Sequence, residues 1–134
     1  MKTIQSTVST PDELYPFHQP LEQIAFFDIE TTGLSPKTSS IYLIGVMHYN
    51  NHKQSWQITQ WFADDYQSEE PILEAFLSYL EDFSYLYHFN GCTFDIPFVK
   101  AKCQKHHIAI PEFSRFCQRP SPARSTMPVP ILIS

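Results

Sequence analysis

Three apolar segments in the first half of the chain predict β-strands. Ile24–Asp28 is a short apolar run, closed by the turn-like sequence TTGLSPKTSS. Ile41–Tyr49 is rich in β-branched and aromatic residues, as buried strands are, and Gln54–Phe62 alternates apolar with polar residues, as half-buried strands do. The turn-like sequence NNHK separates the last two segments. We therefore expect an antiparallel three-stranded meander.

The pattern then changes to the period of an amphipathic helix. Acids and a proline at residues 68–71 mark a helix start, and apolar residues recur at helical spacing through about Phe83. Tyr85–Phe89 predicts a fourth strand, and a second helix is expected from Thr93 or Asp95 onward. The order β-β-β-α-β-α describes an α/β layer fold, in which a meander is followed by helix crossovers onto the same, mixed sheet.

Both ends of the chain differ from this periodic middle part. Residues 1–21 hold three prolines and many small polar residues, so we expect a loosely held N-terminal arm. Residues 22–115 carry the periodic pattern and form the expected domain. Residues 116–134 hold four prolines, no glycine and no acid, and they show neither a helical nor a strand period. An irregular, proline-rich tail is therefore expected.

Composition and charge exclude several protein classes. Hydrophobic residues make up 43% of the 134 residues and aromatic residues 15%, which excludes a disordered chain. The net charge is −5, but residues 1–99 sum to −10, from thirteen acids and three basic residues, and residues 100–134 sum to +5, from six basic residues and one acid. An acidic body argues against a general basic surface for nucleic acid.

Cysteines and hydrophobic runs indicate where the protein is expected to reside. Three cysteines without a CxxC pair argue against a secreted disulfide framework. The N-terminus lacks the apolar core of a signal peptide, and no run approaches the roughly 18 apolar residues that span a bilayer. We therefore expect a cytoplasmic protein without a membrane role.

Asp28 and Glu30 form a D-x-E pair at the end of the first predicted strand. Residues i and i+2 of a strand point to the same face, about 6.5–7 Å apart along the chain, so both carboxylates project together. Two like charges side by side are unfavourable unless protons or cations compensate them. Mg²⁺ and Mn²⁺ take carboxylate oxygens readily. The alternative is a solvated strand end, which is the ordinary role of such a pair.

A second group of residues begins the second predicted helix. Asp95 lies at or just inside the helix start, where an Asp is often only an N-cap. Asn90 could likewise be a turn residue, and Phe94 with Phe98 could be a core-facing stripe. The strand that carries Asp28 and the strand that leads to Asp95 are expected to end at the same edge of the sheet. The three carboxylates are therefore predicted to converge.

The sequence TTGL, which directly follows the acidic pair, offers hydroxyl and backbone N–H groups to a nucleotide or phosphate. Its position, where a strand opens into a loop, is a usual place for a site on a rigid scaffold. The alternative is an ordinary turn in which Gly33 takes a positive φ.

Taken together, FFDIETTGLSP, IYLIGV and HFNGCTFDIPFVKAKC resemble the first two motifs of the DEDD (DnaQ-like) 3′–5′ exonucleases, which have a ribonuclease H-like fold. The sequence of these motifs is most similar to the YprB-like bacterial branch, and the resemblance covers roughly residues 22–107. It implies hydrolysis of phosphodiester bonds at the 3′ end of single-stranded DNA or RNA.

The resemblance also implies a two-metal site with Mg²⁺ or Mn²⁺. By position, Asp28 would bridge both ions, Glu30 would hold the ion beside the attacking water, and Asp95 would contact the other ion through water. The residues that would border the substrate are Thr31, Thr32, Gly33, Leu34, Asn90 and Phe94. Three lysines of the second helix are candidates for phosphate contacts or form a solvated helix face, namely Lys100, Lys102 and Lys105. A zinc site at Cys103, His106 and His107 is disfavoured, because a second ligand pair is lacking.

The sequence departs from the family in its third motif, which supplies a fourth Asp and a His or Tyr. No acid follows Glu112 and no histidine follows His107. The last strand and helix of the fold are expected to be missing, and a changed reading frame or a truncation near Phe116 would explain both absences. We therefore expect weakened catalysis. The alternative function is a catalytically inactive nuclease-fold module that binds single-stranded nucleic acid or a protein partner.

Overall fold

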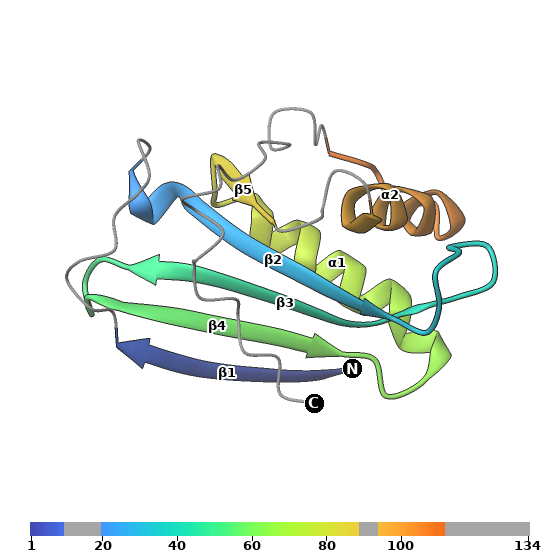
Figure 1. Cartoon of the computed structure of the whole chain (residues 1–134), viewed down its shortest axis with the longest axis horizontal. Helices are drawn as coiled ribbons and strands as arrows, with labels where there is room; N and C mark the ends of the chain where they lie inside the picture. Colours follow the sequence, from blue (N-terminus) through green and yellow to red (C-terminus); the bar gives the residue numbers. More distant parts are fainter. Residues whose placement is uncertain (10–19, 89–93, 112–134) are drawn as a thin grey trace.

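The computed structural model describes residues 1–9, 20–88 and 94–111 of the chain (Figure 1). Its sheet has five strands in the order β1-β4-β3-β2-β5. The strands are β1 (Lys2–Ser9), β2 (Ile24–Thr31), β3 (Ile41–Asn50), β4 (Ser55–Phe62) and β5 (Tyr85–Tyr87). The helices are α1 (Glu69–Leu80) and α2 (Ile96–Lys105), with short 3₁₀ turns at Leu21–Gln23 and Tyr66–Ser68.

The central strands form the expected meander. β2 pairs with β3 and β3 with β4, both antiparallel, and β5 lies parallel to β2 on its other side. A parallel neighbour requires a crossover connection, and α1 supplies it. The mixed α/β sheet is therefore as predicted. The expected lack of a last strand and helix concerns residues after Pro111, which lie outside the described part of the chain.

The expectation of a loosely held arm is wrong for residues 2–9. These residues form β1, which pairs antiparallel with β4 from Lys2 opposite Phe62 to Ser9 opposite Ser55. The amino group of Met1 adds an ion pair with Asp64 at 2.8 Å. The sequence KTIQSTVS is mostly polar because an edge strand need not bury a whole face, so hydrophobic pattern alone does not identify it.

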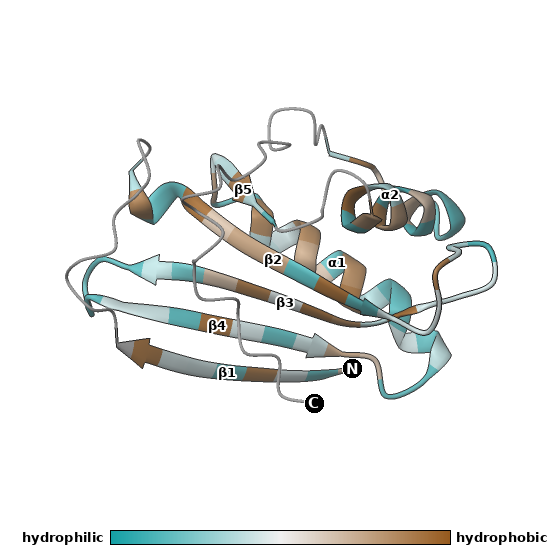
Figure 2. Cartoon of the chain, in the orientation of Figure 1, coloured by the Kyte–Doolittle hydropathy of each residue, from teal (hydrophilic) through white to brown (hydrophobic). Residues whose placement is uncertain are grey.

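Both faces of the sheet are buried. On one face, alternate residues of β2 pack with α1 and α2, including Ala25, Phe27 and Ile29. On the other face, Ile24 and Phe26 pack with residues of β3, β4 and β5. Figure 2 shows hydrophobic residues along β2 and β3 and on the helices α1 and α2.

β2 continues further than its apolar run predicts. The pairing with β3 extends past Asp28 to Thr31, with a register shift between Glu30 and Thr31. Asp28 and Glu30 therefore lie inside a strand, which fixes their backbones better than a loop would.

Within the part of the chain that the structure describes, no helix is long and apolar enough to cross a membrane.

Candidate active site

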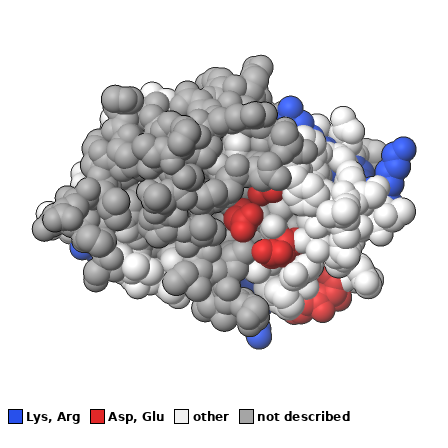
Figure 3. Space-filling model, in the orientation of Figure 1, with Lys and Arg blue, Asp and Glu red and all other residues white. Residues whose placement is uncertain are grey.

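The acidic pair lies where the sheet leaves one side of β2 uncovered by a described strand. β5 pairs only with Ile24–Phe26, so its pairing with β2 ends before Asp28. Asp28 and Glu30 share the face of β2 that also carries Ile24 and Phe26, away from α1. Figure 3 shows acidic side chains gathered over the C-terminal half of β2, with the visible lysines and arginines at the periphery of this face.

Asp95 joins this pair from the start of α2. It precedes the first residue of the helix, but its side chain makes no capping hydrogen bond. Its carboxyl group instead hydrogen-bonds the carboxyl group of Asp28. The N–H of Ile29 donates to Asp28 Oδ1 at 3.0 Å and also bonds the Asp95 carboxyl group. The structure therefore brings Asp28 and Asp95 together, as the topology predicted, and the side chain of Asp95 is not acting as an N-cap.

The proton affinity of all three carboxyl groups is raised, chiefly by burial. Burial and the neighbouring Asp28 charge raise the pKa of Asp95 to about 7, and Glu30 adds to this effect. Burial also raises the pKa of Asp28, although its bonds to Ile29 and Asp95 oppose the rise. Burial and the Asp28 charge raise the pKa of Glu30. The Asp28–Asp95 pair therefore retains a proton at a higher pH than two free carboxyl groups would.

This arrangement suits a cation that replaces the shared proton. Two carboxyl groups in hydrogen-bonding contact, with a third close enough to repel them, offer the hard oxygen ligands that Mg²⁺ and Mn²⁺ take. Among residues 1–9, 20–88 and 94–111, no group of three or more His, Cys, Asp or Glu side chains is already arranged to hold a metal ion. The chemistry of the donor set, carboxylate oxygens alone, fits a divalent cation of this kind.

The loop after β2 is held by its own threonines. Thr31 Oγ1 donates to the carbonyl of Gly33 at 2.7 Å. Thr32 Oγ1 accepts from the N–H of Ser40 at 2.9 Å, and the Thr32 N–H donates to the Ser40 carbonyl at 2.9 Å. Both hydroxyl groups therefore shape the loop in this structure, and their contact with a nucleotide stays a prediction.

Gly33 is required for a different reason from the positive φ considered above. No described glycine has a positive φ. A Cβ atom at position 33 would lie 2.3 Å from Ser39 Oγ and 3.4 Å from Ser39 Cβ. Ser39 is buried, so its hydroxyl has little room to give way. The close approach of two loop segments, and not backbone strain, demands glycine.

Gly33→Ala is therefore expected to displace the β2–β3 loop and lower stability by about 1–3 kcal/mol, as overpacking does. Gly33→Ala/Ser39→Ala removes the hydroxyl at 2.3 Å and should recover most of that loss. Urea unfolding of both variants measures the effect. Equal stability of Gly33→Ala and the unsubstituted protein would contradict the argument.

The remaining predicted substrate residues are placed as follows. Leu34 is 87% exposed at the surface of the loop, as a side chain that meets a base would be. Phe94 is half-buried and packs on Phe98 with ring centroids 5.5 Å apart, so part of it belongs to the core. Asn90 lies outside the described residues.

The expectation that Lys102 contacts phosphate or lies on a solvated helix face is wrong. Lys102 is buried, and its Nζ lies 3.7 Å from Glu69 Oε2. Lys100 and Lys105 are exposed and stay candidates. Sequence reasoning missed the ion pair because Glu69 lies on α1, far from Lys102 along the chain. His106 also bonds Glu69, and Cys103 is a buried free thiol, so neither supports a zinc site.

Gln60 is a polar residue of the same sheet face that sequence reasoning missed. In the cross-strand pairing, Asp28 lies opposite Gly45 and Gly45 opposite Gln60, so all three share one face. Gln60 is buried, and its Nε2 has no hydrogen-bond partner in the part of the chain that the structure describes. A buried amide donor of this kind is one that a water or a ligand can satisfy.

Comparison with known proteins identifies the family of this chain. The chain is 40% identical over 50 residues to the DNA polymerase of Ostreid herpesvirus 1 (isolate France), a match that covers 36% of the chain and 3% of the polymerase. The chain thus spans a small part of that relative's length. The family model of the RNase H superfamily matches residues 25–119, which is more than half of the chain. With the mixed sheet described above, this match confirms the ribonuclease H-like fold, and the chain belongs to the RNase H superfamily.

Proposed function

We propose that this chain carries a metal-dependent 3′–5′ exonuclease domain of the DEDD (DnaQ-like) group, closest to its YprB-like branch. It would hydrolyse phosphodiester bonds at the 3′ end of single-stranded DNA or RNA, in the cytoplasm. The observation that carries the proposal is the contact between the carboxyl groups of Asp28 and Asp95, with Glu30 on the same face. A fold alone does not define a reaction, whereas converging acidic groups limit the chemistry.

The residues of this site would act as ligands and as a frame for the substrate. Asp28, Glu30 and Asp95 would hold two Mg²⁺ or Mn²⁺ ions. When bound, such ions activate a water for attack on the phosphodiester and stabilise the leaving 3′ oxygen. The Ile29 N–H holds the Asp28 and Asp95 carboxyl groups in place. Leu34, whose side chain is exposed on the loop, would pack against the terminal base.

The test uses 5′-labelled single-stranded DNA and RNA with Mn²⁺. We expect a ladder of shortened products from the unsubstituted protein, none from Asp28→Ala, and an unchanged ladder from Glu74→Gln, a control on the exposed side of α1. A 3′-phosphate on the substrate should block the ladder if cleavage starts at the 3′ end. A ladder from Asp28→Ala as strong as that from the unsubstituted protein would refute the proposal.

A second candidate function is favoured by the composition of the final residues of this sequence, because residues 113–134 hold no acid and residues 108–134 no histidine. A nuclease fold without the third motif could bind single-stranded nucleic acid, or a protein partner, without cutting it. Binding of the labelled strands without any products, unchanged in Asp28→Ala, would establish the nucleic-acid-binding form of this module in place of the enzyme.

A further inference from the structure

We propose that Glu69 is a positioning residue for the acidic site, although it lies outside it. One buried carboxylate fastens both the loop and the helix that border Asp28, Glu30 and Asp95. The expected effect of Glu69 on metal binding rests on the proposed function. The contacts of Glu69 described below do not depend on that function. Glu69 is the first residue of α1, and its side chain is 2% exposed.

The first attachment holds the loop. Glu69 Oε2 accepts a hydrogen bond from the N–H of Ile41 at 2.7 Å. Ile41 begins β3 directly after the loop, and the preceding Ser40 bonds Thr32 through both its N–H and its carbonyl. Glu69 therefore fixes the point at which the loop carrying Gly33 and Leu34 returns to the sheet.

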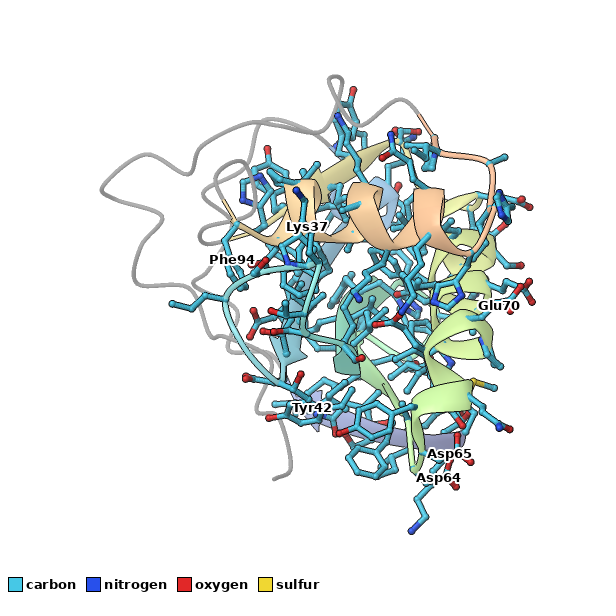
Figure 4. All side chains as sticks on the ribbon, turned by 90° about the vertical axis from the view of Figure 1, so that its right-hand side faces the viewer. Lys37, Tyr42, Asp64, Asp65, Glu70 and Phe94 are labelled. Atoms are coloured by element: carbon cyan, nitrogen blue, oxygen red, sulfur yellow. The ribbon has the colours of Figure 1, made fainter. Side chains whose placement is uncertain are left out.

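The second attachment holds α2. Glu69 Oε1 lies 2.7 Å from His106 Nε2, and Glu69 Oε2 lies 3.7 Å from Lys102 Nζ. Lys102 is itself 2% exposed and lies over the ring of Phe98, 5.9 Å from its centroid. Figure 4 shows α2 spanning the view from Phe94 at one end toward Glu70 of α1 at the other.

The attachment to α2 sets where Asp95 lies. Asp95 precedes α2 and is seven residues from Lys102, about two helical turns or roughly 10 Å along the axis. A helix is stiff over this distance, so a hold on its C-terminal half fixes the direction of its N-terminal end. Groups that orient ligands in this way change metal affinity about 10–100-fold when they are removed.

A purely stabilising role does not account for this charged cluster. A buried ion pair is often no more stable than well-packed apolar side chains of similar volume, because its desolvation offsets its attraction. What the carboxylate supplies, and an apolar side chain cannot, is hydrogen bonding to a backbone N–H and an imidazole together with an ion pair to an ammonium group. The two directional hydrogen bonds join β3 and α2 to the start of α1, and the ion pair adds a second link to α2.

The test compares Glu69→Met/Lys102→Met, which removes both charges and keeps the volume, with the unsubstituted protein. We expect a cooperative unfolding transition, a roughly tenfold weaker Mn²⁺ affinity by calorimetry, and faster amide hydrogen exchange at residues 32–41 and 96–99. Excess Mn²⁺ should restore part of any lost cleavage, which it could not do for a misfolded protein.

Glu70→Gln is the matched control, because Glu70 is half exposed and its carboxylate only approaches His106 Nδ1 at 3.9 Å. It should leave all three measurements unchanged. If the double variant does not fold, the same measurements on Glu69→Gln test the inference, since this substitution keeps the side-chain volume and loses only the charge. Unchanged Mn²⁺ affinity and unchanged hydrogen exchange in the folded variant would overturn the inference. If the unsubstituted protein binds no Mn²⁺ and cuts nothing, the proposed function fails, whereas the exchange rates still test the role of Glu69.

Discussion

Asp95→Asn will lower Mn²⁺ affinity by at least about a hundredfold and abolish Mn²⁺-dependent cleavage, while α2 stays folded. Asparagine caps helices as well as aspartate does, so the substitution leaves any capping role intact. It removes only the negative charge that would bind the cation. Loss of groups behind a metal ligand already costs 10–100-fold in affinity, so loss of a ligand should cost at least the upper part of that range.

Calorimetry with Mn²⁺ measures the affinity, and circular dichroism measures the helix content. Glu22→Gln, an exposed substitution outside the acidic group, is the control and should bind Mn²⁺ normally. An Asp95→Asn protein with normal Mn²⁺ affinity and normal cleavage would show that Asp95 is structural only.

The second large effect is on the pH dependence of stability without metal. In EDTA, the unsubstituted protein should lose up to about 4 kcal/mol relative to Asp95→Asn between pH 4 and pH 7. Burial and the Asp28 charge raise the pKa of Asp95 from 3.8 to about 7, so the folded state binds this proton more tightly than the unfolded state. The resulting stability is fully present below pH 3.8 and is lost as the pH rises through 7.

Other groups titrate in the same window with the opposite sign. Burial lowers the pKa of both His48 and His88, so their contribution to stability falls as the pH drops below about 6.5. Because these histidines are present in both proteins, the difference between the two urea-unfolding curves removes their contribution and reports the acidic group, that is Asp95 together with its coupling to Asp28 and Glu30. Saturating Mg²⁺ or Mn²⁺ should restore the stability of the unsubstituted protein at pH 7 and above. The same ions should leave the stability of Asp95→Asn nearly unchanged. A difference between the two proteins that does not vary with pH would contradict this account.

The sequence predicts the central sheet well because its signals there are local. The apolar runs of β2 and β3 and the alternation of β4 each belong to one segment. The two-residue period of a strand places Asp28 and Glu30 on one face. The strand predicted fourth along the chain, which is β5, lies parallel to β2 and directs Asp95 toward them. These inferences need only secondary structure and topology.

What the sequence did not predict depends on contacts between distant residues. The polar β1 becomes a strand through its pairing with β4. The spacing of Lys102 on its helix suggests a surface lysine, and only Glu69 on another helix makes its burial tolerable. The need for glycine at position 33 likewise comes from Ser39 across the loop. Pattern within one segment carries none of this information.

The most direct test of the acidic site is a crystal structure of the protein soaked in Mn²⁺, with anomalous scattering recorded at the manganese edge. We expect an anomalous peak within about 2.5 Å of carboxylate oxygens of both Asp28 and Asp95, with their mutual hydrogen bond broken. A map at saturating Mn²⁺ in which these two carboxyl groups stay hydrogen-bonded, with no peak beside them, would contradict it.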